Sequence, residues 1–176
     1  MIAGVPAPAP PTPSSGQLEF RVASFADLSA RTLHDLLRLR VDVFVVEQAC
    51  AYPEIDGRDV EPDTRHLWFA RDGVPVAYLR LLTEPDPTGK PGDVVRIGRV
   101  VVARNARGGG LAGRLMSEAL TIVGSRPCVL DAQSHLVGFY ARFGFVATGP
   151  EYVEDGIPHV PMRRDPATPA PRRPDA

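Results

Sequence analysis

The chain is poor in lysine and has no apolar run long enough to cross a bilayer. Of 20 lysine and arginine residues only Lys90 is a lysine, the arginines are scattered, and the formal net charge is −1. The sequence therefore predicts no basic surface for nucleic acid. Residues 1–16 have neither the basic start nor the apolar core of a secretory signal. We expect a cytoplasmic protein with no nucleic-acid and no membrane partner.

Cysteine is also scarce, and the metal-binding residue types lack the spacing of known metal sites. Cys50 and Cys128 lie far apart without a CxxC pair, which predicts reduced thiols. The four histidines show no zinc spacing. We expect no metal, and we expect the acidic residues after the first helix to lie on a solvated loop: Glu54, Asp56, Asp59, Glu61 and Asp63.

Composition separates one folded domain from two terminal segments. Residues 1–16 are rich in proline, and residues 166–176 are rich in proline, alanine and arginine. Such segments bury too little apolar surface to offset the entropy of ordering, so both are predicted to be disordered tails. Residues 17–165 form the remaining domain, and a hydrophobic content of 44% is enough for one core.

Hydrophobic periodicity predicts strands and helices in the order β–α–β–β–β–α–β–α–β–β. Ser29 is expected to cap the first helix, and Ser134 the last, which Gly144 would end. The expected strands are 18–25, 66–71, 74–84, 94–103, 128–133 and two short C-terminal segments, and the first two helices are 30–46 and 110–124. The pattern predicts an α/β protein with a mixed, mostly antiparallel central sheet flanked by helices.

The glycine-rich segment 103–113 has two interpretations. Gly108, Gly110 and Gly113 have the GxGxxG spacing of a dinucleotide site, with Asp131 as the acidic partner. That fingerprint requires the first glycine at the end of a strand in the first βα unit, and here residues 103–107 intervene. The alternative is a phosphate cradle built from glycine N–H groups and the helix start, with Arg107 as an added cation.

The second interpretation is supported by resemblance to a known family. Arg107-x-x-Gly110-x-Ala112 resembles the Arg/Gln-x-x-Gly-x-Gly/Ala motif of the GNAT superfamily of N-acetyltransferases, and Tyr140 with Gly144 and Phe145 resembles its Tyr-x-x-x-Gly-Phe element. Over about residues 30–165 the sequence is similar to the ElaA-like subgroup. The segments that carry this are LRLRVDVFVVEQACAYPEIDGRDVEPDTRH, RIGRVVV, AQSHLVGFYARFGF and EDGIPHVPM.

The resemblance implies a GNAT-like acyl-CoA N-acyltransferase fold with acetyl-CoA as the acetyl donor. The cofactor's diphosphate would lie on the glycine loop, and its pantetheine arm along a strand splayed from its neighbour. The implied cofactor-binding residues are Val100, Val101, Val102, Arg107, Gly108, Gly109, Gly110, Leu111, Ala112, Gly113 and Gln133. A backbone N–H near Val101 or Val102 would polarise the thioester carbonyl.

The resemblance also implies the chemistry: direct transfer of acetyl to a primary amine, with Tyr140 as general acid. Tyr140 also lies on the apolar stripe of its helix, which suits a core role. The leading candidates for the general base are Glu47 and His66, whereas His135 lies near the expected acyl site or only decorates a helix start.

The alternative to an enzyme is a CoA-binding sensor or interaction module of the same fold. For an enzyme, a polyamine, an aminoglycoside, an amino acid or a protein amine would each suit the acceptor position. The last strands often pair between subunits in this superfamily, so the resemblance implies a homodimer.

Overall fold

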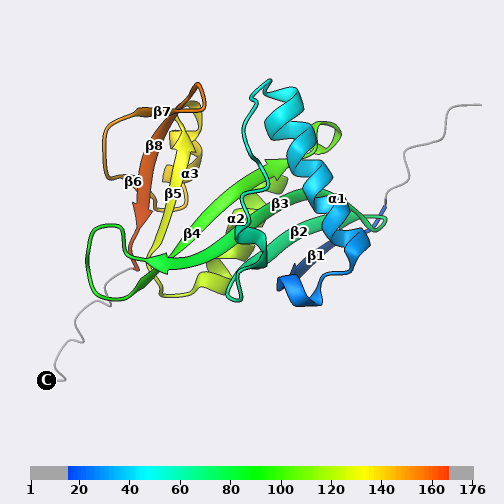
Figure 1. Cartoon of the computed structure of the whole chain (residues 1–176), viewed down its shortest axis with the longest axis horizontal. Coiled ribbons are helices and arrows are strands. Elements are labelled where there is room, and N and C mark those ends of the chain that lie inside the picture. Colours follow the sequence, from blue (N-terminus) through cyan, green and yellow to red (C-terminus); the bar gives the residue numbers. More distant parts are fainter. Residues whose placement is uncertain (1–15, 167–176) are drawn as a thin grey trace, which may run out of the picture.

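One continuous sheet organises residues 16–166, the part of the chain that the computed structural model describes (Figure 1). Its strands follow the order β1-β2-β3-β4-β5-β8-β6, and β7 pairs with β8. The strands are β1 (Leu18–Ala23), β2 (Arg65–Arg71), β3 (Val74–Pro85), β4 (Asp93–Val102), β5 (Cys128–Gln133), β6 (Val146–Ala147), β7 (Tyr152–Glu154) and β8 (Ile157–Arg164). β4 and β5 are parallel and the other pairs antiparallel, which confirms the predicted mixed sheet. The predicted disordered tails lie almost entirely outside these residues.

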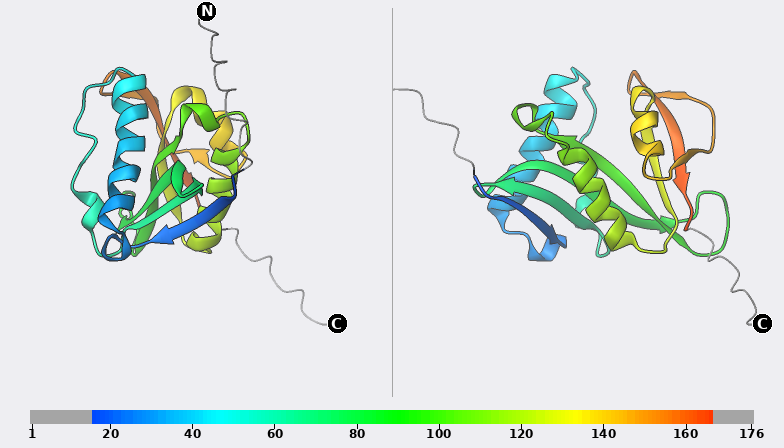
Figure 2. Two further views of the ribbon diagram at one scale, coloured as in Figure 1. Left: turned by 90° about the vertical axis from the view of Figure 1, so that its right-hand side faces the viewer. Right: turned by 180° about the vertical axis from the view of Figure 1, so that it is seen from behind.

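Helices cover both faces of the sheet. α1 (Ala30–Arg40) crosses one face, and α2 (Leu111–Val123) and the short α3 (Val137–Ala141) pack on the other (Figures 1 and 2). Each face has its own apolar cluster. The α1 side includes Leu36, Trp68, Tyr78 and Val101, and the α2 side includes Leu67, Leu79, Leu115, Leu130 and Met162. No helix of the described residues is long and apolar enough to span a membrane.

The first helix begins as predicted and then widens. The Ser29 hydroxyl accepts a hydrogen bond from the Thr32 N–H at 3.0 Å, which is the expected N-cap. From Val41 to Glu47 the chain continues as a π-helix (η2), with five-residue hydrogen bonds such as the one from the Gln48 N–H to the Val43 carbonyl. Wide turns of this kind are rare and are often found at functional sites.

The C-terminal third differs from the prediction in two places. Ser134 does not cap a helix: it starts a 3₁₀ turn (η5, Ser134–Leu136), and its hydroxyl donates to Glu151 at 2.5 Å. The short strand β7 is additional to the two short C-terminal strands that were predicted, and it forms because the turn at Asp155 and Gly156 folds it back onto β8. The long loop after η2 also contains a 3₁₀ turn, η3 (Arg58–Val60).

Candidate active site

A gap in the sheet defines the site. β4 and β5 are paired only where Val95 meets Cys128 and Arg96 meets Val129. Beyond these two pairs the strands diverge, and Figure 1 shows the space between them widening toward the upper end of the sheet. A cleft of about 1020 Å³ opens there, lined by both strands and by the segments above them. The splayed strands that the family resemblance implies are therefore present.

A bulge in β4 lies beside this gap. Tyr78 of β3 pairs with Val101 and Arg80 pairs with Gly98, so Leu79 faces two residues of β4, Arg99 and Val100. Arg99 adopts a left-handed backbone conformation with φ of 56°, which is uncommon for a residue with a side chain. A bulge re-aims backbone groups that a regular ladder would occupy. Backbone N–H and C=O groups of β4 are therefore available to a ligand in the gap.

Two side-chain contacts bridge the cleft above the gap. The Gln133 amide donates to the Gln48 side-chain oxygen at 3.3 Å, and the Cys50 thiol donates to the Asp155 carbonyl at 3.3 Å. Both contacts join the end of η2 to the β5 and β8 half of the sheet. This bridge divides the rim of the cleft into a side facing α2 and a side facing the loop after η2.

The glycine loop at the start of α2 is shaped for an anion. Gly108 and Gly110 have left-handed φ values of 86° and 72°, which glycine adopts without strain. The first helical hydrogen bond runs from the Arg114 N–H to the Gly110 carbonyl at 3.1 Å. The N–H groups of residues 111–113 come before it and point out of the helix start, where the helix dipole favours negative charge. These N–H groups can donate hydrogen bonds to an anion at the helix start.

Arg107 links this loop to the first helix. Its guanidinium binds the Glu47 carboxylate through two hydrogen bonds of 2.5 and 3.0 Å, and its Nε donates to the Val102 carbonyl at 3.1 Å. The hydrogen bond from Arg107 holds the pKa of Glu47 below its usual range. The residues expected to bind phosphate and to act as base are thus bound to each other.

Tyr140 lies in the wall of the cleft on the α3 side. It is buried, and its ring packs edge-on against Phe139 and Phe145, with centroids 5.0 and 6.3 Å apart. Burial raises the pKa of Tyr140 to about 12. The phenol is therefore protonated at neutral pH.

Comparison with known proteins identifies the family. Residues 33–166 match the model of the acetyltransferase (GNAT) domain. The chain belongs to this family. It is 40% identical to the protein ElaA of Escherichia coli over 152 residues, covering 84% of this chain and 97% of that protein. It is 53% identical to a UPF0039 protein of Mycobacterium tuberculosis over 139 residues, covering 78% and 87%.

Solved structures give the same assignment. An acyl-CoA N-acyltransferase from Pseudomonas aeruginosa is 48% identical with a TM-score of 0.76, covering 84% of this chain and 99% of that chain. The crystal structure of E. coli ElaA is 39% identical with a TM-score of 0.77, covering 85% and 100%. The described domain therefore has the GNAT acyl-CoA N-acyltransferase fold.

His66 is not brought to the cleft of this GNAT domain. It is completely buried beneath η3, with Nδ1 at 2.8 Å from the Tyr78 hydroxyl and Nε2 at 3.0 Å from the Asp59 carbonyl. Burial lowers the pKa of His66. Both ring nitrogens are used inside the fold, so the position predicted for a base at the amine entrance holds a structural histidine.

The expectation of a solvated acidic loop is wrong for Glu54 and Asp59, whereas Asp63 is exposed as expected. Glu54 and Asp59 are only 3% and 4% exposed, and both bind the buried Arg40, at 2.5 and 2.7 Å. Arg80 of β3 joins them through Asp59 at 2.9 Å and Asp56 at 2.5 Å. One signal was present in the sequence: Arg40 occupies a position on the apolar stripe of the first helix, where an unpaired charge is not tolerated.

The same face of the sheet continues as a charged groove in front of β4 and β5. Arg96 binds Glu84 at 2.6 Å and Asp131 at 2.5 Å, so Asp131 is an ion-pair partner. The dinucleotide interpretation of the GxGxxG spacing is wrong, because the GNAT sheet has a single parallel strand pair in place of a doubly wound parallel sheet. Among the described residues, no cluster of three or more histidine, cysteine or acidic side chains could hold a metal ion.

Proposed function

We propose that the protein is an acetyl-CoA-dependent N-acetyltransferase that moves an acetyl group directly to a primary amine. The observation that carries this proposal is the gap between β4 and β5, where unpaired β4 backbone meets a phosphate-shaped glycine turn. An extended ligand with a diphosphate at one end matches both features at once. The bound donor supplies a thioester, which is activated toward attack by an amine.

The residues of the gap would bind and orient that donor. The backbone of Val100–Val102 offers strand-like hydrogen bonds beside the bulge. The left-handed turn at Gly108 and Gly110, with the N–H groups of Leu111–Gly113, would hold the diphosphate. A β4 N–H near Val101 would stabilise negative charge on the acyl oxygen.

Tyr140 would act as the general acid that protonates the leaving sulfur. Its pKa of about 12 is above that of an ordinary thiol, so the phenol keeps its proton until charge develops on the sulfur. It then stabilises that charge by donating the proton. Glu47 is a poor base in this arrangement, because Arg107 stabilises its charged form.

Ligand binding and transfer are tested separately. Saturating acetyl-CoA at about one hundred times its Kd should stabilise the fold by roughly 2.7 kcal/mol, a rise of a few degrees in the melting temperature, whereas NADH should give none. Mass spectrometry of amine mixtures incubated with protein and acetyl-CoA then detects transfer. Stabilisation by acetyl-CoA without any acetylated amine would indicate a CoA-binding sensor, and stabilisation by NADH alone would reject the proposal.

A further inference from the structure

His159 of β8 is a cleft residue that the proposed function leaves unused. It lines the cleft, is half-buried, and its Nδ1 lies 2.8 Å from the Ile157 carbonyl oxygen. A carbonyl oxygen only accepts, so Nδ1 must carry a proton, and in the neutral ring Nε2 is the basic nitrogen. The fold thus fixes one tautomer of this histidine.

The strand register places His159 level with the β4 bulge. His159 pairs with Gln133 of β5, and Val129 of β5 pairs with Arg96 of the parallel strand β4. Counting onward from this pair, and allowing for the extra residue in the β4 bulge, sets Gln133 level with Val100 and Val101. His159 therefore lies across the open part of the sheet from the backbone that would bind the acyl group.

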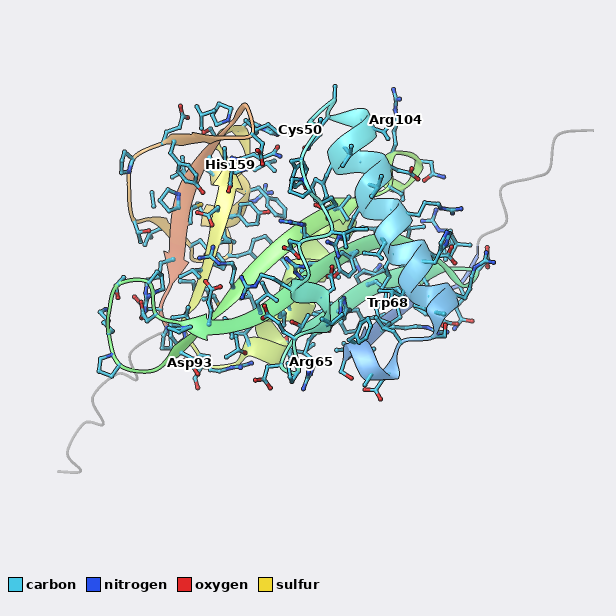
Figure 3. The ribbon with its side chains drawn as sticks, viewed as in Figure 1. Cys50, Arg65, Trp68, Asp93, Arg104 and His159 are labelled. Carbon is cyan, nitrogen blue, oxygen red and sulfur yellow. The ribbon has the colours of Figure 1, made fainter. Side chains whose placement is uncertain are left out.

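The alternation of side chains places His159 on the opposite face from Tyr140. Val160 and Met162 of β8 pack in the α2-side core, to which Tyr140 also belongs. Residue 159 must therefore point to the α1 side, where the charged groove lies. In Figure 3 it is seen at the open end of the sheet, near the segment that carries Cys50. A proton acceptor and a proton donor thus flank the gap from two faces.

Two acidic groups of the cleft, Asp56 and Glu47, are bound by arginines. Although burial opposes it, the hydrogen bonds from Arg80 hold the pKa of Asp56 well below its usual range, and Arg107 does the same for Glu47. Groups made more acidic in this way are weak proton acceptors. The charged and titratable groups that face His159 are Tyr152, whose ring centroid is 6.0 Å away, with Glu154 on β7, Asp155 in the turn and Asp131 on β5.

We infer that His159 is the general base of the transfer, an inference that rests on the proposed function. Nε2 takes one proton from the ammonium group of the acceptor in the groove. The amine nitrogen then forms the new bond to the acyl carbon, and the carbon–sulfur bond breaks with its electron pair going to sulfur. The nitrogen then loses a second proton. One of the two protons lost by the nitrogen replaces the proton that Tyr140 gives to sulfur, and the other passes to solvent.

The test compares His159→Asn with the variants His34→Asn and His135→Asn. The asparagine amide can keep the hydrogen bond to the Ile157 carbonyl while removing Nε2. We expect kcat/KM for the amine to fall by about 10²- to 10³-fold and the acetyl-CoA melting shift to remain. His34→Asn, on the exposed side of α1, should change nothing.

A second measurement does not depend on activity. Nitrogen-15 NMR of the histidine rings in the free protein should show that the neutral His159 ring is protonated at Nδ1 and bare at Nε2. The opposite tautomer would overturn the inference, as would full activity of His159→Asn or a loss found in His135→Asn instead. If the unmodified protein binds acetyl-CoA but acetylates no amine, the proposed function fails first and the inference fails with it.

Discussion

Arg107 and Glu47 form a bidentate ion pair that joins the glycine loop of α2 to the last turn of η2. The pair places a carboxylate beside a cradle built for phosphate oxygens. A bound diphosphate and Glu47 would therefore compete for the same guanidinium. The pair would therefore weaken diphosphate binding, and it also connects two segments that line the cleft.

Replacing Glu47 with glutamine should tighten the binding of coenzyme A a few-fold, because it removes the competing charge and frees Arg107. Calorimetric titration at low and high salt measures this, and the gain should shrink at high salt, where exposed charges are screened. The turnover number should stay within a few-fold of the original. A loss of a hundredfold or more would instead restore Glu47 as the base that the sequence suggested.

Gly110→Ala should weaken both the fold and the binding of coenzyme A. The left-handed φ of 72° strains any residue with a side chain, so the free energy of unfolding should drop by about 1 kcal/mol. Gly109→Ala is the matched control, because Gly109 has no left-handed φ and a Cβ there meets no atom within 4 Å. Urea unfolding compares the two variants. Equal losses would show that the conformation of residue 110 is not what the loop requires.

Tyr140→Phe should separate binding from catalysis. The substitution removes one hydroxyl from a buried aromatic cluster, so the acetyl-CoA melting shift should be retained. The turnover number should fall by about 10²-fold or more, in the range typical of a lost general acid. Full activity of this variant would reduce Tyr140 to a core residue. Since its pKa lies near 12, the rate of the unmodified protein should show no loss from tyrosine ionisation below about pH 11.

Asp59→Asn should be among the most destabilising conservative changes on the α1 face. It removes the one carboxylate that binds both Arg40 and Arg80 and leaves only Glu54 and Asp56 to balance them, and breaking a buried ion pair typically costs about 3–5 kcal/mol. Urea unfolding measures this, with Asp35→Asn at the exposed Arg31 pair as a control that should leave the midpoint unchanged. A similarly small effect at both positions would contradict the role of the buried network.

The pH dependence of the same variant has a defined sign. Burial raises the pKa of Asp59, but the hydrogen bond and charge of Arg40, with those of Arg80, overcome this and hold the pKa below its usual range. A lowered pKa contributes stability above the unfolded-state pKa, and this is lost as pH falls through the folded-state pKa. Unfolding free energy should therefore decline below about pH 4, and less steeply in Asp59→Asn.

Local patterns were sufficient for most of the fold. The Ser29 cap, the strands predicted at 66–71 and 74–84, and the strand over 128–133 follow from short-range propensity and appear where expected. The widening of α1 into a π-helix has no such signature, and neither does β7, whose pairing depends on the turn that folds it onto β8.

The site was less accessible to sequence reasoning, because its key contacts join distant segments. Nothing local shows that Arg107 meets Glu47, or that His66 is enclosed by Tyr78 and Asp59. His159 was missed for the same reason, since its place at the cleft depends on its pairing with Gln133 of β5, which is distant in the chain.

The two ladder pairs between β4 and β5 also bear on how this protein unfolds. A continuous sheet gains cooperativity from its backbone ladder, but here that ladder joins strands β5 to β8 to the rest at only two residue pairs, and the α2-side core supplies the other contacts. Without a ligand, amide exchange should be fastest along the unpaired end of β4 and should spread into the C-terminal unit. A molecule that fills the gap adds the missing ladder. A donor bound in the gap would then make the two parts of the sheet unfold together.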